Sequence, residues 1–269
     1  MRLINRMPSR PVQFALGALP FVILICLYLY GSHARLAENP KDKILPSITQ
    51  MAESIDRLAF VPSKRTGELL FWKDTVSSLK RLAWGVGIAA LIGLFIGIVI
   101  GAIPLFNVTF SPFFTAIAMV PPIALLPILF IVFGLGEVAK IILIIVGITP
   151  FLIRDMQKRA MEIPREQLIK AQTLGANTAQ IINRAILPQV LPRLIDSVRL
   201  ALGTAWLFLI SAEAIASTEG LGYRIFLVRR YLSMDVIIPY VLWITLLAFA
   251  LDFALRLVNK RLFPWYGKE

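Results

Sequence analysis

Long apolar stretches recur along this chain, and each is about as long as a membrane is thick. The hydrocarbon core of a bilayer is roughly 30 Å thick and needs a helix of roughly 20 mainly apolar residues. Hydrophobic residues make up 58% of the 269-residue chain, charged residues make up 16%, and the mean hydropathy is +0.76. No soluble domain needs so much apolar surface. We therefore predict an all-α membrane protein with one membrane domain over residues 1–269.

The apolar stretches predict about six transmembrane helices. They are expected at residues 13–30, 82–103, 113–133, 138–153, 194–217 and 236–258. The first stretch has the basic start of a signal peptide, but no small-residue cleavage site follows it, so we expect a retained span. Residues 1–81 then contain the N-terminal helix and an external segment, and residues 82–258 contain the core helices.

Basic residues orient the predicted helices. Arg2, Arg6 and Arg10 precede the first span, and the segment 154–193 between the fourth and fifth spans is also basic. Because cytoplasmic loops carry an excess of Lys and Arg, we predict that both ends of the chain and this segment are cytoplasmic. Several basic residues would then lie outside, against the rule: Lys80, Arg81, Arg224, Arg229 and Arg230.

The predicted external segment, residues 32–79, has apolar residues at helical spacing, such as Ile48, Met51, Ile55 and Leu58. This pattern predicts an amphipathic helix on the outer face of the membrane.

Small residues and prolines distinguish the second and third spans. Gly93, Gly97 and Gly101 recur at every fourth position, which predicts close packing against another helix. In the third span three prolines remove backbone donors and bend the helix, so that the freed carbonyls must face protein or a water-filled cavity. A helix that lines a pathway and a simple packing kink both fit. These prolines are Pro121, Pro122 and Pro127.

Two carboxylates, Glu213 and Asp252, lie well within predicted spans, where a charge is costly. Glu213 either lines a pathway or a dimer gate, or is tied to a neighbouring hydroxyl or lysine. Asp252 is expected to pair with Arg256, one helical turn away.

Several kinds of catalytic chemistry lack the residues they need. Cys26 is the only cysteine, so an intrachain disulfide, a thiol-metal cluster and a redox pair are excluded. His33 is the only histidine and is expected in a solvated loop, so a histidine metal site or a Ser/His/Asp triad has little material to work with. The chain has neither the G-x-x-x-x-G-K-[ST] loop that cradles ATP phosphates nor an H-E-x-x-H motif. We therefore expect no metal and no cofactor in this chain, and no intramembrane enzyme activity.

The predicted cytoplasmic segment 154–193, here called the coupling loop, is polar yet predicted to be ordered. Residues 165–174 form a helix, Gly175 supplies a left-handed stop, and residues 177–180 are close to a capping box that opens a second helix. Pro188 and Pro192 are expected to break the chain before it re-enters the membrane. Such a rigid, partly apolar protrusion indicates docking to another subunit more than an ordinary re-entry loop.

The coupling loop resembles the cytoplasmic motif of binding-protein-dependent ABC importer permeases. That motif reads Glu-Ala-Ala, three residues, Gly, nine residues, Ile, any residue, Leu-Pro. The spacing from Gly175 to Leu187 and Pro188 fits, whereas Ile169 and Lys170 replace Glu-Ala, and Ala185 replaces Ile. Residues 121–137 and 203–223 look like the branch that imports nitrate, sulfonates, taurine or bicarbonate.

The resemblance implies partners rather than an activity of this chain alone. Two cytoplasmic ATPase subunits would bind ATP and Mg and grip the coupling loop, a second copy would complete the pathway, and an extracytoplasmic solute-binding protein would deliver the solute. The chain would then work by alternating access in a bacterial inner membrane and would not bind nucleic acid. The residues expected to contact the ATPase subunits are Ala171, Gln172, Thr173, Leu174, Gly175, Ala176 and Asn177.

An ion-coupled secondary transporter is the alternative function, although no internal repeat supports it. The solute is expected to be a small anion, and the outward arginines Arg224, Arg229 and Arg230 would suit anions or an acidic patch on the delivery protein. The residues expected to line the pathway are Met119, Pro121, Pro122, Leu125, Trp206 and Glu213.

Overall fold

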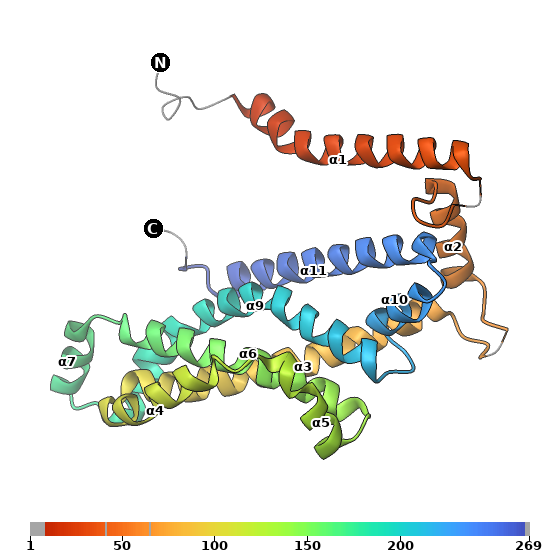
Figure 1. Ribbon diagram of the computed structural model, residues 1–269. Helices are drawn as coiled ribbons and strands as arrows, with labels where there is room; N and C mark the ends of the chain where they lie inside the picture. Colours follow the sequence, from red (N-terminus) through yellow and green to blue (C-terminus); the bar gives the residue numbers. More distant parts are fainter. Residues whose placement is uncertain (1–8, 41, 65, 267–269) are drawn as a thin grey trace.

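The computed structural model describes residues 9–40, 42–64 and 66–266, and all regular elements in these ranges are helical (Figure 1). Arg2 and Arg6, which helped to orient the first span, lie outside the described residues. The elements are α1 (Arg10–Glu38), α2 (Ile48–Phe60), α3 (Leu70–Ala102), α4 (Pro104–Ile117), the 3₁₀ turn η2 (Pro122–Leu125), α5 (Leu126–Phe133), α6 (Glu137–Met161), α7 (Arg165–Thr173), α8 (Thr178–Ile181), the π-helical stretch η3 (Ile182–Ile186), α9 (Leu187–Ile215), α10 (Leu221–Arg229) and α11 (Met234–Leu262).

Four helical stretches are long and apolar enough to cross a membrane, or five if the bent pair of α4 with η2 and α5 counts as one span. The four are α1, α3, the continuous stretch Thr178–Ile215 and α11. The all-α membrane class is thus confirmed. The predicted span 138–153 lies in α6, which is not one of the four because charged side chains such as Lys140, Arg154 and Asp155 limit its apolar length.

The third predicted span, residues 113–133, is not one kinked helix. The chain forms α4 and then η2 with α5, and the two parts are bent by 78°. Pro121 and Pro122 lie at the break, where each lacks the backbone N–H that would continue the helix. The predicted bend is present, and it is large enough to divide the stretch into separate helices.

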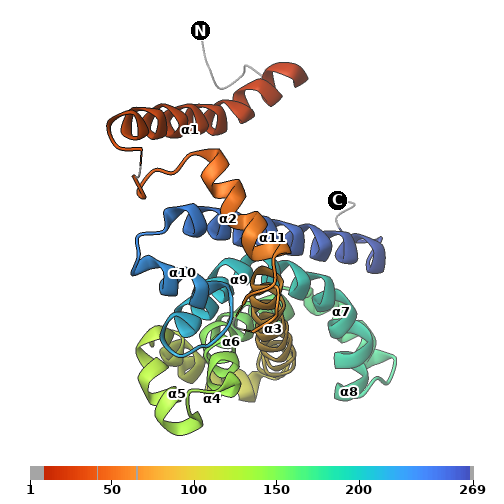
Figure 2. The same cartoon turned by 90° about the vertical axis from the view of Figure 1, so that its right-hand side faces the viewer.

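The core of the bundle forms where α3, α6 and α9 pack together (Figures 1 and 2). On α3 the glycine stripe faces α6, and a Cβ added to Gly97 would lie 2.5 Å from Cβ of Met156 and 2.8 Å from the carbonyl oxygen of Ile153. Gly93 and Gly101 are equally tight against α6. The predicted close packing of this stripe is confirmed.

Gly97→Ala is therefore expected to force α3 and α6 apart. Overpacking of a filled interface costs about 1–3 kcal/mol, which should lower the midpoint of unfolding in detergent measured by circular dichroism. The matched control is Gly87→Ala in the same helix, because no atom lies within 4 Å of a Cβ at that position. Equal midpoints for the two variants would contradict the packing argument.

Pro188 and Pro192 do not break the chain, contrary to the prediction. Thr178–Ile215 runs as one continuous helical stretch, with the π-helical η3 directly before Pro188. The wider π turn changes the hydrogen-bond pattern where proline lacks a donor, so the helix continues. The carbonyl of Pro192 accepts a hydrogen bond of 3.0 Å from Nδ2 of Asn259 in α11, which ties this part of α9 to α11.

The predicted amphipathic helix before the core is present as α2. Ser47 caps it with a full capping box in which Gln50 is the reciprocal partner. The buried hydroxyl of Ser54 donates to Asp235 at the start of α11, which fixes α2 to the bundle. Helix α1 lies apart from the bundle in both views (Figures 1 and 2).

Candidate functional site

The coupling loop has the local structure that its sequence predicts. Helix α7 ends in a Schellman motif, in which N–H of Ala176 donates to the carbonyl of Ala171 at 3.0 Å and N–H of Gly175 to that of Gln172 at 2.9 Å. Gly175 has a φ of +82°, the left-handed conformation that favours glycine. Asn177 then opens α8 with a capping box, because its side chain and that of Gln180 each accept the other's backbone N–H at 2.9 Å.

All seven residues predicted to contact an ATPase subunit lie together on this protrusion, at the end of the bundle marked α7 in Figure 1. The apolar side chain of Leu174 is 83% exposed at its tip, and Ile169 in α7 is exposed as well. A Cβ added to Gly175 would have no atom of this chain within 4 Å. The turn between α7 and α8 is therefore ordered by its own backbone and open on its outer side.

Ion pairs hold the base of the coupling loop. Glu162, just after α6, accepts hydrogen bonds from Nη1 of Arg193 at 2.6 Å and from Nη1 of Arg159 at 3.2 Å. Partial burial raises the pKa of Glu162, but these hydrogen bonds and the two positive charges outweigh it, so the net pKa is lowered. The carboxylate stays ionised at neutral pH and links the end of α6 to the start of α9.

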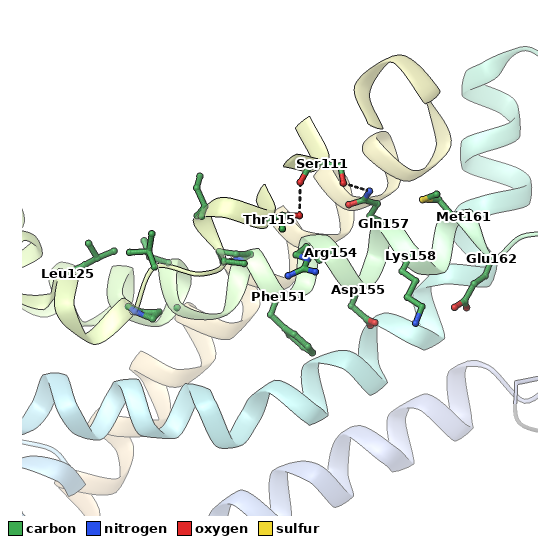
Figure 3. A pocket seen from close by; sticks show the side chains of 17 residues that line it. Ser111, Thr115, Leu125, Phe151, Arg154, Asp155, Gln157, Lys158, Met161 and Glu162 are labelled. Carbon is green, nitrogen blue, oxygen red and sulfur yellow. Dashed lines mark hydrogen bonds between the residues drawn. The ribbon is translucent and has the colours of Figure 1, made fainter. Parts of the chain in front are cut away.

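A cavity of about 960 Å³ lies between α4, η2 and α6 (Figure 3). Two residues predicted for the pathway, Pro122 and Leu125, line it. Its polar lining comes from α4 and from the C-terminal end of α6 with the residue that follows it, and consists of Ser111, Thr115, Arg154, Asp155, Gln157, Lys158 and Glu162.

The structure does not bring the other predicted pathway residues into this cavity. Met119 and Pro121 are exposed next to it. Trp206 is 4% exposed and Glu213 is 0% exposed, so both are enclosed by their own chain and lie outside the cavity lining. Neither side chain reaches this cavity, and their exposure to a pathway shared with a second copy stays a prediction.

Glu213 is instead tied into the bundle, the second of its two predicted roles. Its carboxylate accepts hydrogen bonds from Oγ of Ser78 at 2.7 Å, from Nη1 of Arg81 at 2.7 Å and from N–H of Gly222 at 2.8 Å. The predicted hydroxyl partner is present, and the cation is an arginine rather than a lysine. A carboxylate at this depth is stabilised only when a charge and several donors satisfy it.

Glu213 is one member of a larger group that we call the buried ion cluster: Asp74, Arg81, Glu213 and Arg224, with the exposed carboxylate of Glu137 at its edge. Arg81 also donates from Nη2 to Glu137 at 2.8 Å, and Nε of Arg224 donates to Asp74 at 2.7 Å. The cluster joins α3 to α6, α9 and α10. Arg224 is consequently not an outward arginine that attracts anions, because its side chain is largely buried against Asp74.

Asp252 has a partner that the sequence did not indicate. Arg256 lies at 3.3 Å as predicted, but Nε of Arg199 in α9 donates to Asp252 at the shorter distance of 2.8 Å. The pair therefore fastens α11 to α9.

Across the described ranges, no group of three or more His, Cys, Asp and Glu side chains is placed to hold a metal ion.

Comparisons with known proteins agree with one another. The profile of the family described as binding-protein-dependent transport system inner membrane component matches residues 89–264. The taurine transport system permease protein TauC of Escherichia coli K12 is 31% identical over 260 residues, which is 97% of this chain and 92% of that protein. The bicarbonate transport system permease protein CmpB of Synechococcus elongatus is 32% identical over 185 residues, covering 68% of this chain and 66% of that one.

A solved structure has the same fold. A chain of the methionine ABC transporter MetNI, in inward-facing conformations, superposes with a TM-score of 0.64 at 22% identity. The match covers 74% of this chain and 98% of the MetNI chain.

Proposed function

Since this chain belongs to the family of inner membrane components of binding-protein-dependent transport systems, we propose that it pairs with a second copy to form the pathway of an importer for a small anion. The chain is the permease subunit of an ATP-binding cassette importer. Two cytoplasmic subunits would bind ATP and Mg and supply the energy, and an extracytoplasmic binding protein would deliver the solute. The permease itself would need no cofactor.

The observation that carries this proposal is the exposed turn between α7 and α8. This turn is an ordered protrusion with an exposed apolar tip, which suits a contact with another protein. Because the chain has no phosphate-binding loop, a separate ATP-binding subunit must supply the energy through such a contact. A contact with a cytoplasmic motor would need the coupling loop to be cytoplasmic, and the positive-inside rule favours the same side for both chain ends. Closure of the motor subunits would switch the pathway between outward and inward openings.

The solute class is proposed from the relatives. Taurine and bicarbonate, the solutes in the names of two of them, each carry an anionic oxygen group. We extend this chemistry to the present chain as a sulfonate, carboxylate or related oxyanion.

Co-purification tests the proposed function. When this chain is co-expressed with a candidate ATP-binding subunit from the same genome and extracted in mild detergent, we expect the two to elute as one complex with ATPase activity. Elution of this chain alone, with solute uptake driven by a proton or sodium gradient in vesicles, would instead establish the ion-coupled secondary transporter.

Leu174→Ala should weaken the complex without unfolding the permease. Burying a leucine side chain in a partner contributes about 1.5–3 kcal/mol, so its truncation should reduce retention of the ATPase subunit by at least tenfold. Retention can be measured as the dissociation constant in detergent. Leu135→Ala is the matched control, since Leu135 is also exposed in a turn but lies between α5 and α6. The same weakening in the control would locate the contact elsewhere.

A further inference from the structure

We infer that the cavity between α4, η2 and α6 is an oxyanion site at the inner end of the pathway, with Arg154 and Lys158 as its cationic ligands. This inference rests on the proposed function, because it names the residues that would meet the solute before release. In this inference Arg154 and Lys158 supply the positive charge. Arg224 does not supply it, because Asp74 neutralises Arg224 within the buried ion cluster.

The charges around the cavity carry the inference. Its lining contains two cations, Arg154 and Lys158, and two carboxylates, Asp155 and Glu162. Both carboxylates are compensated by residues outside the lining: Asp155 accepts a hydrogen bond from Ser197 and lies 3.6 Å from Nε of Arg159, and Glu162 is paired with Arg159 and Arg193. Within the described ranges, the side chains of Arg154 and Lys158 have neither an ion-pair partner nor a hydrogen-bond partner. The uncompensated charge of the cavity is therefore positive.

The neutral polar side chains of the cavity leave one hydrogen-bond donor available to a ligand. Gln157 is buried, and its Nε2 donates to Oγ of Ser111 at 3.0 Å (Figure 3). Because Oγ of Ser111 is already an acceptor, and its own proton has no acceptor among the described residues, that proton is available to a ligand. Thr115 donates to the backbone carbonyl of Ser111 at 2.8 Å, which orders this turn of α4.

The chemistry of these groups selects the ligand. Arg154 and Lys158 are four residues apart on α6, so they lie one turn apart on the same side of the helix. Two like charges at this spacing repel each other, and a shared anion removes the repulsion. The planar guanidinium binds two oxygens of a carboxylate, sulfonate or phosphate at once. Leu125, Val146 and Phe151 provide an apolar wall for the rest of a small organic anion.

Protection from a thiol reagent tests the site. Ala118 lines the cavity, and Ala118→Cys in a Cys26→Ser background provides one reporter thiol. The full importer complex in phosphatidylcholine nanodiscs is labelled with a small water-soluble maleimide. The probes are isethionate, a small sulfonate, and ethylene glycol, an uncharged molecule of similar length. We expect isethionate to slow labelling saturably, by tenfold or more, and ethylene glycol to have no effect.

Two paired variants identify the ligands. Arg154→Gln with Lys158→Gln should abolish the protection by isethionate, and Arg154→Lys alone should retain part of it. Lys260→Gln with Arg261→Gln, at the end of α11, removes the same charge away from the cavity and should leave the protection unchanged. Protection that persists in the Arg154 and Lys158 variant, or that is absent in the parent, would overturn the inference.

Lipid phosphate is the other source of an oxyanion. If phosphatidylglycerol nanodiscs protect the thiol without isethionate, and isethionate adds nothing in phosphatidylcholine, the cations bind headgroups and the solute site is overturned. ATP-driven uptake by the unmodified complex is measured in parallel. Uptake without protection would reject this site alone, whereas absence of ATP-driven uptake would reject the proposed function.

Discussion

Gly175→Asp is expected to abolish solute uptake while the permease still inserts into the membrane at a near-normal level. The φ of +82° at this position adds a backbone cost of about 1 kcal/mol for a residue with a side chain. No atom of this chain lies within 4 Å of the added Cβ, so the rest of the permease does not resist the change. Any larger effect must come from a partner pushed away by the new bulk and charge.

Gly67→Asp is the matched control for this prediction. Gly67 has a φ of +69° and equally open surroundings, but it lies in the segment between α2 and α3. Uptake, ATPase activity and retained ATPase subunit are measured for both variants in reconstituted vesicles. We expect only Gly175→Asp to lose all three, and normal transport with the motor still bound would show that the coupling contact is elsewhere.

Arg81→Met should cost the permease most of its stability. The variant leaves the enclosed carboxylate of Glu213 without its cation, and breaking a buried ion pair on one side costs about 3–5 kcal/mol. We expect little folded protein in the membrane and a much lower unfolding midpoint in detergent. Arg35→Met is the control, because Arg35 pairs with Asp42 at the surface, where such a pair contributes about 0–1 kcal/mol.

A double variant separates lost charge compensation from lost packing. Arg81→Met with Glu213→Gln removes the uncompensated charge together with the cation, so it should be more stable than Arg81→Met alone. The losses of stability of Arg81→Met and Glu213→Gln are also measured separately. If the loss in the double variant equals their sum, the ion pair is not what Arg81 contributes.

The coupling loop was predictable because its signals are local. A glycine that ends one helix and an Asn–Gln pair that begins the next lie within six residues, and each determines backbone geometry without tertiary help. The apolar stretches were predictable for a similar reason, since length and hydropathy alone define a span. Pro188 and Pro192, near the end of the loop, were misinterpreted because η3 accommodates them, which no local pattern indicates.

The buried ion cluster was not predictable in its pairing. Arg81 and Glu213 are 132 residues apart, and only the folded bundle brings them together. The sequence signal was the cost of a carboxylate within a span, which predicts a cation without saying which one. Because the sequence did not identify Arg81 or Arg224 as the partner of a buried carboxylate, the predicted topology left both as external basic residues. The polar cavity likewise depends on the 78° break after α4, whose size the prolines do not determine.

Solute uptake with a controlled energy source tests the central claim most directly. Vesicles containing this chain and its ATP-binding partner receive the binding protein on one face and ATP on the face of α7 and α8, with ionophores that collapse proton and sodium gradients. We predict uptake of the labelled anion that requires hydrolysable ATP and is unaffected by the ionophores. Uptake that continues without the ATP-binding partner and stops when the ionophores are added would contradict the account.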